Sequence, residues 1–254
     1  MKALRLAVGL AGALAWGAAQ AYVPPATAVL KRLSQKREEQ AVATMEVQGT
    51  VTFLGEAAVR AAGAGVPLLG NEASSPAFLT VKVPGKCRLE LALPDAAPAE
   101  RPAVSQKGSR LHGVRGLERI PAAVAALQAV CALLGERPGG AEPERPWVQA
   151  LSALGVSLDE ISLGRAGGRV AYVIGGKPNG EKALAWVDKQ GYQPLRLAAT
   201  LGGARHEVRF LDWGSSTGGD LFPRAVEVLA AGQPVLRLVT ERVLGNPKVP
   251  DSIF

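Results

Sequence analysis

The sequence predicts an α+β fold: one strongly curved antiparallel β-sheet, covered by an N-terminal helix and an inserted helical pair. Three observations favour it. Segments of alternating apolar and polar residues, separated by Gly and Pro turns, recur along most of the length of the mature chain. Two helical segments interrupt them near the middle, and no regular strand-helix alternation indicates a parallel sheet. A sheet of this size closes or curls, and a curled sheet under helices encloses an apolar cavity.

The first twenty-one residues have the pattern of a secretory signal peptide. Lys2 and Arg5 precede an apolar run over residues 6–18, and Ala19-Gln20-Ala21 has the small-x-small pattern of a cleavage site. We therefore expect cleavage after Ala21 and a protein that works outside the cytoplasm. The run is short for a membrane span, and Tyr22 stands where a lipid-carrying cysteine would be. Residues 22–254 are expected to form a single soluble domain.

The charge of the mature chain is modest. Without Lys2 and Arg5 it carries 27 basic and 22 acidic side chains, a net charge of +5. The basic residues are scattered, and aromatic residues make up only 5% of the sequence. A nucleic-acid-binding protein would show a basic stripe with stacking aromatics, so this class is disfavoured.

The first half of the mature chain contains a helix followed by strands. Helical spacing of apolar residues predicts a short amphipathic helix over 27–39, with Thr27 as its N-cap. Strict alternation predicts a half-buried strand over 44–53. The Ala- and Gly-rich segment 57–75 is interpreted as a loop or as a longer excursion at the end of a hairpin. The following strands are expected over 77–83 and 87–93, joined by a Pro-Gly turn, with a small hairpin over 104–112.

The middle of the chain predicts the helical pair. Residues 122–134 are almost entirely Ala, Val and Leu, with Pro121 before them and Gly135 after, which indicates a buried helix. A second short helix passes through Trp147, Leu151 and Leu154. Seven strands then follow with turn residues between them, as in an antiparallel meander. They are expected over 158–163, 169–174, 183–188, 195–201, 207–212, 225–229 and 235–244.

The two cysteines leave two interpretations open. In an oxidising compartment Cys87 and Cys131 are able to form a disulfide, and the sequence does not show whether they meet. Each lies in an apolar segment, so each is equally well explained as a small core residue.

Catalytic patterns are scarce, and we predict no enzyme, no catalytic residue, no metal and no cofactor. His112 and His206 are far apart and lack any metal-ligand spacing. The segment 214–218 formally matches the G-x-S-x-G motif around Ser216, but it lies between two predicted strands rather than between a strand and a helix. In the segment 175–182, Gly180 is followed by Glu181, whereas a phosphate-binding loop has its phosphate-contacting lysine at that position.

Several segments, in order, resemble the periplasmic outer-membrane lipoprotein carrier and sorting proteins, the LolA-like superfamily. The residues are Ala77–Glu90 with its Lys-x-Pro turn, the Val-Ser hairpin of 104–111, the Asp-to-Pro hairpin of 185–197 and the ending 246–254. The resemblance implies an unclosed β-barrel with a helical lid, a periplasmic location and a cavity that holds the acyl chains of a lipoprotein. Where the family has an arginine that latches the lid, this chain has Val83, and Arg88 is the nearest candidate for that role.

The ligand is expected to contact apolar side chains of the early strands. These candidate cavity residues are Met45, Val47, Val51, Phe53, Leu79, Val81, Leu89 and Leu91. Burial of an acyl chain is worth about 0.8 kcal/mol per methylene, so a partly filled cavity would bind such a ligand well. The competing interpretation is that the same residues pack against the helices as ordinary core, and it applies equally to the helix over 122–134.

Three functions follow for testing. The first is a monomeric periplasmic carrier, or chaperone, for lipoproteins or other lipid-like apolar ligands. The second is an envelope-stress sensor or adaptor domain that binds a membrane-bound signalling protein. The third is a secreted hydrolase acting through Ser216, which the missing base makes the weakest of the three.

Overall fold

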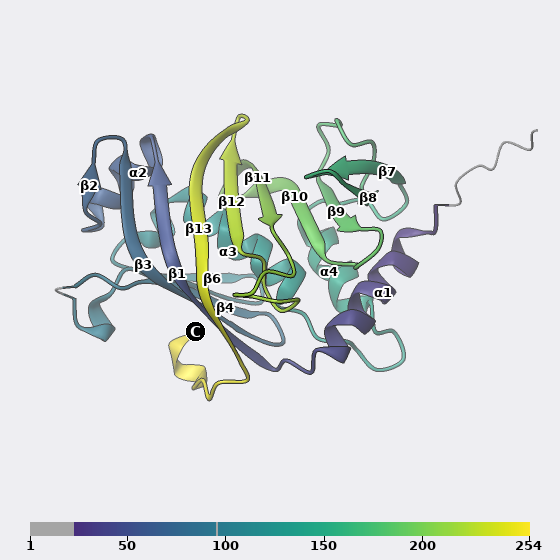
Figure 1. Ribbon diagram of the computed structural model, residues 1–254, viewed down its shortest axis with the longest axis horizontal. Coiled ribbons are helices and arrows are strands. Elements are labelled where there is room, and N and C mark those ends of the chain that lie inside the picture. Colours follow the sequence, from purple (N-terminus) through teal and green to yellow (C-terminus); the bar gives the residue numbers. More distant parts are fainter. Residues whose placement is uncertain (1–22, 95) are drawn as a thin grey trace, which may run out of the picture.

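The computed structural model describes residues 23–94 and 96–254, so the expected signal peptide lies outside the described residues. An antiparallel sheet of thirteen strands curls around one apolar helix, α3, which passes behind the strands in Figure 1. Among the described residues the two end strands of the sheet do not pair with each other, so the sheet stays open. The predicted fold class, α+β with an unclosed curved sheet, is confirmed.

Apart from β2 and the first residues of β3, the strands lie close to the ranges that alternation predicts. They are β1 (Thr44–Leu54), β2 (Leu68–Leu69), β3 (Glu72–Lys82), β4 (Lys86–Leu91), β5 (Ala103–Lys107), β6 (Arg110–Val114), β7 (Ile161–Ala166), β8 (Arg169–Ile174), β9 (Leu184–Asp188), β10 (Pro194–Leu201), β11 (Ala204–Leu211), β12 (Ala225–Ala230) and β13 (Gln233–Gly245). Their order is β6-β5-β4-β3-β1-β13-β12-β11-β10-β9-β8-β7, with β2 on β3. The first and last long strands, β1 and β13, therefore join the two halves of the sheet.

The helices lie at two places around the sheet. They are α1 (Ala26–Glu39), α2 (Glu56–Gly63), α3 (Pro121–Leu134) and α4 (Arg145–Ala153), with 3₁₀ turns η1 (Pro98–Glu100), η2 (Leu117–Arg119) and η3 (Asp251–Ile253). Helix α1 contacts α4, and α4 contacts α3 (Figure 1). The predicted N-cap Thr27 is wrong: the helix begins at Ala26, and the carbonyl of Pro25 accepts the first helical hydrogen bond, from Ala28 N at 3.0 Å.

One predicted loop is in fact a helix followed by a strand. Residues 57–75 contain all but the first residue of α2, then β2 and the start of β3. Alanine has the highest intrinsic helix propensity, and α2 buries Ala57, Ala58 and Ala61 against the sheet. The glycines that suggested a loop lie at and beyond the last turn of this helix, where they end it.

Irregular pairing gives the sheet part of its curvature. The register shifts between Gln48 and Gly49 where β1 meets β13, and again between β12 and β13 and between β9 and β10. Such bulges increase the local twist of a strand. At Gly49 a Cβ atom would overlap the carbonyl oxygen of Val239, so the two backbones approach closely only because this residue is glycine.

The C-terminal segment crosses the ends of β3 and β4. The Asp251 carboxylate lies 2.8 Å from Lys82 Nζ and 2.9 Å from Lys86 Nζ, and hydrogen bonds from these two lysines lower the pKa of Asp251 to about 2. Arg88 Nη1 donates to the Ile253 carbonyl oxygen at 3.0 Å. These polar contacts hold the last residues on the side chains around the β3–β4 turn.

The two faces of the sheet differ in character. The inner face carries the main apolar cluster together with α3, whereas the outer face carries ion pairs such as Arg196–Glu207 and Arg209–Glu227. A second, smaller apolar cluster around Trp186 and Leu195 lies on the outer face of β8–β10. Within the part of the chain that the structure describes, no helix is long and apolar enough to span a bilayer.

Candidate functional site

The eight predicted cavity residues lie together on the inner face of β1, β3 and β4. Met45 is paired with Val81 and Val47 with Leu79, and Leu79 is paired in turn with Leu89. All eight are at most 2% exposed. The alternation in the sequence therefore identified which face of these three neighbouring strands is buried. That these residues bind a ligand stays a prediction.

Helix α3 fills the space opposite these strands. Twelve of its fourteen residues are buried, and it contains no charged side chain. The enclosed apolar void that remains beside it measures about 10 Å³, roughly the room of one water molecule. Its lining comes from both halves of the sheet and from the helix: Val51, Leu79, Leu89, Ala126, Leu127, Val130, Val226, Leu236 and Leu238. In this state the interior is closed, and an acyl chain fits only if α3 is displaced.

The predicted residues form only part of the lining of this void. Of the eight expected residues only Val51, Leu79 and Leu89 line the void, and the other five pack elsewhere in the core. The missed residues belong to β12, β13 and α3. Alternation over 225–229 and 235–244 marked the apolar face of the late strands, but nothing local to these segments indicated that β13 pairs with β1.

The disulfide between Cys87 and Cys131 attaches α3 covalently to β4. The two Cα atoms are 5.8 Å apart, which is an ordinary separation for this bond. Gly135 makes the close approach possible, since a Cβ atom there would lie 2.6 Å from the Cys131 carbonyl oxygen and 3.2 Å from Cys87 Sγ. Cys87 and Cys131 therefore form a disulfide, which the sequence alone did not establish.

Three donors from outside the helix bind the carbonyl groups at the C-terminal end of α3, which have no partner within the helix. Trp147 Nε1 of α4 donates to Leu133 O at 3.2 Å, and Arg37 Nη2 of α1 donates to Leu134 O at 3.2 Å. Gly85 N, in the β3–β4 turn, donates to Gly135 O at 2.7 Å. Helices α1 and α4 therefore hold this end of α3 through its terminal carbonyl groups.

Arg37, not Arg88, is the arginine that contacts α3. Arg37 also donates to Leu221 O at 3.2 Å, and burial lowers the pKa of its guanidinium to about 10. Arg88 instead donates to Glu90 and to Ile253 O. The interpretation of Arg88 as the latch is wrong, because its side chain leaves β4 on the face opposite Cys87 and Leu89. No local pattern around Arg37 distinguished it from the other basic residues of α1.

Glu136 gives the end of α3 a pH dependence. It follows Gly135, and burial raises the pKa of its carboxyl group to about 7. A carboxyl whose pKa is higher in the folded than in the unfolded protein stabilises the fold fully below the unfolded value, and this stabilisation is lost as pH rises through the folded value. The closed state is therefore expected to lose stability between about pH 4.5 and pH 7.

Replacement Glu136→Gln tests this expectation. Between pH 5 and pH 8 the free energy of unfolding of the parent protein should fall by about 1–2 kcal/mol more than that of the variant, since the carboxyl stays partly hydrated. Urea titrations followed by tryptophan fluorescence measure the difference. Glu142→Gln, at an exposed ion pair with Arg145 on the neighbouring loop, is the matched control and should keep the parent profile. Equal pH profiles for Glu136→Gln and the parent would contradict the assignment.

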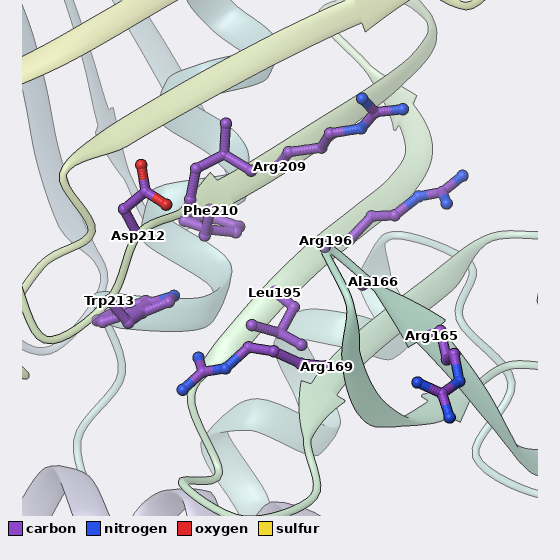
Figure 2. A pocket seen from close by; sticks show the side chains of 11 residues that line it. Arg165, Ala166, Arg169, Leu195, Arg196, Arg209, Phe210, Asp212 and Trp213 are labelled. Carbon is purple, nitrogen blue, oxygen red and sulfur yellow. The ribbon is translucent and has the colours of Figure 1, made fainter.

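An open cleft of about 520 Å³ lies on the outer side of the sheet, away from α3. Figure 2 shows Arg165 and Arg169 approaching it from the β7–β8 hairpin, Arg196 and Arg209 from β10 and β11, and Trp213 from the end of β11. Arg196 and Arg209, both paired with Glu207, extend toward the same side in Figure 2, whereas Arg165 and Arg169 extend in other directions. The arrangement does not converge on one bound anion.

Two polar residues considered for catalysis, His206 and Ser216, have structural surroundings that explain their presence. His206 is buried, and its Nδ1 lies 2.8 Å from Leu201 O. Ser216 lies in a tight loop between the bridge partners Ser215 and Gly219, with strands on both sides. Among the described residues no group of three or more His, Cys, Asp or Glu side chains is arranged to hold a metal ion.

The fold and this interior define an open antiparallel half-barrel around a covalently attached apolar helix. No family model matches the chain, and no curated protein matches it. It is similar in structure to a LolA superfamily protein from Nitrosomonas europaea, with 14% identity, a TM-score of 0.47, and coverage of 91% of this chain and 98% of the other. That protein bears the name of the superfamily that the sequence motifs resemble.

Two further solved structures are similar. A DUF1329 family protein from Desulfovibrio piger has 10% identity and a TM-score of 0.40, with coverage of 91% of this chain and 98% of the other. MucB, solved in complex with MucA(peri), has 15% identity and a TM-score of 0.29, with coverage of 90% of this chain and 58% of the other. At these identities and TM-scores the likenesses indicate no function, which has to come from the contacts of this chain.

Proposed function

We propose that this protein is an exported, periplasmic carrier that binds the acyl chains of lipoproteins or of other lipid-like ligands between its curved sheet and α3. The observation that carries the proposal is the uncharged helix α3, buried in the concave side of a sheet whose end strands leave it open. The pattern of residues 1–21 supports export, and the motifs shared with the lipoprotein carriers support the class of ligand.

The physical basis is an exchange of apolar contacts. The inner strands and α3 bury each other, and an acyl chain that moves between them replaces helix-to-sheet contacts with lipid contacts at both surfaces. Burial of about twelve methylenes is worth roughly 10 kcal/mol, which is enough to offset the partial separation of one short helix. The void of about 10 Å³ means that this separation must accompany binding.

Native mass spectrometry of protein purified from a lysate that contains membranes tests the proposal. We expect adducts with the masses of acyl lipids, and uptake of a fluorescent fatty acid by delipidated protein, with competition by unlabelled palmitate. Leu69→Ser is the matched control, because Leu69 is 87% exposed and is a site at which the dye could bind nonspecifically. Uptake into the interior should be the same in this variant as in the parent protein. Empty protein with no competable uptake would refute the carrier function.

A second candidate function is an adaptor for a membrane-bound signalling protein. An exposed apolar tip favours it, formed by Val59 of α2 and by Leu68 and Leu69 of β2, which are 66%, 47% and 87% exposed. Contiguous exposed apolar side chains mark interaction surfaces more often than isolated ones do. A stable membrane-protein partner in a pull-down, lost in Leu69→Asp, would support this function over the carrier.

A further inference from the structure

Helix α3 is attached to one half of the sheet much more firmly than to the other. At its C-terminal half the disulfide fixes Cys131 to Cys87 of β4. At its N-terminal end, η2 joins α3 directly to β6 and contacts both β5 and β6. Both ends of the helix are thus tied to the β4–β6 half of the sheet.

The contact of α3 with β10, β11 and β12 is of a different kind. It is apolar apart from one hydrogen bond among the described residues, in which Gly202 N of the β10–β11 turn donates to Gln128 Oε1 at 2.8 Å. The strand side chains on this side are buried and aliphatic or aromatic: Leu197, Ala199, Val208, Phe210, Val226 and Val228. We call this contact the α3 seam.

A covalent bond determines which contacts separate first. Separation of α3 from β4 would require breakage of the disulfide or unfolding around it. Separation along the α3 seam breaks one direct hydrogen bond, releases one side of the Arg37 bridge between Leu134 O and Leu221 O, and exposes apolar surface. An entering acyl chain covers that same surface, so the ligand itself compensates for most of the loss.

On the basis of the proposed carrier function, we propose that α3 is a one-sided lid and that the acyl chain enters along the α3 seam, between the helix and β10–β12. The strands that bind the chain are then mainly the late strands, and α3 keeps its contacts with β4 and β5. The early-strand residues Met45, Val81 and Leu91 remain core in the loaded protein, and Val226 and Phe210 become ligand contacts.

Photo-crosslinking locates the chain. The disulfide-intact protein is incubated with a palmitate analogue that carries a diazirine on its chain, irradiated and digested, and the labelled peptides are identified by mass spectrometry. We expect label on β10–β12 and α3, removed by excess palmitate. Label confined to β3–β5 would overturn entry along the α3 seam but leave the carrier function standing. Absence of competable label anywhere would overturn both the carrier function and entry along the seam.

Two variants sharpen the test. Gln128→Ala removes the one hydrogen bond across the seam, so the initial rate of labelling should rise by about two- to tenfold. Gln48→Ala, whose amide bonds Glu46 on the outer face, should leave the rate unchanged. The double variant Cys87→Ala/Cys131→Ala frees α3 from β4, and label should then appear on β4 and β5 as well. If the double variant keeps the parent pattern, the disulfide does not direct entry.

Discussion

Replacement of both cysteines by alanine is expected to lower the free energy of unfolding by about 4 kcal/mol. The disulfide closes a loop between residues 44 positions apart, and a loop of that length restricts the unfolded chain strongly. The bridge also fixes the apolar helix α3 to the sheet, so its removal loosens the centre of the fold. Urea unfolding followed by tryptophan fluorescence measures the change.

Reductant provides the control for this prediction. Unfolding of the parent protein in excess dithiothreitol should match that of the double variant, and the double variant should not respond to reductant. A loss below about 1 kcal/mol would mean that packing alone holds α3 in place, against the range usual for native disulfides.

Leu127→Ala is expected to destabilise the protein by about 3 kcal/mol, within the usual range of about 2–5 kcal/mol for buried leucines. Leu127 is fully buried and lines the void between α3 and both halves of the sheet. The substitution adds empty volume to a space that now admits one water molecule, because the surrounding strands are fixed in the sheet.

The same variant should bind small apolar molecules better than the parent, since the added volume is lined only by apolar atoms. Leu69→Ala is the matched control for stability: Leu69 is 87% exposed, so this change should stay within about 0.5 kcal/mol of the parent. A loss of less than about 1 kcal/mol for Leu127→Ala would show that the interior is loosely packed and that α3 moves without cost.

The fold was predictable where the pattern is local. Period-2 alternation located β1 and β8 within a residue or two, and the run of Ala, Val and Leu after Pro121 located α3. Helix α2 was missed because it is short, ends at Gly63 and is followed closely by Gly65 and Gly70, and its helical conformation depends on burial of Ala57, Ala58 and Ala61 against the sheet. Local composition gave no information on that tertiary contact.

The site was predictable only in part, because it depends on contacts between distant segments. The face of β1, β3 and β4 followed from alternation, but the opposite wall requires the pairing of β1 with β13, across nearly two hundred residues. The helix-end contact of Arg37 and the disulfide of Cys87 also join residues far apart in the sequence. Neither has a spacing signature that a single sequence reveals.

A crystal structure of the delipidated protein soaked or co-crystallised with palmitate tests the central claim most directly. We expect the interior to widen from about 10 Å³ to at least about 300 Å³, with α3 still bonded to Cys87 and the chain lying against β10–β12. If the interior stays closed in the palmitate-treated crystal, with palmitate either not bound at all or bound only to the outer face of the sheet, the carrier function is contradicted.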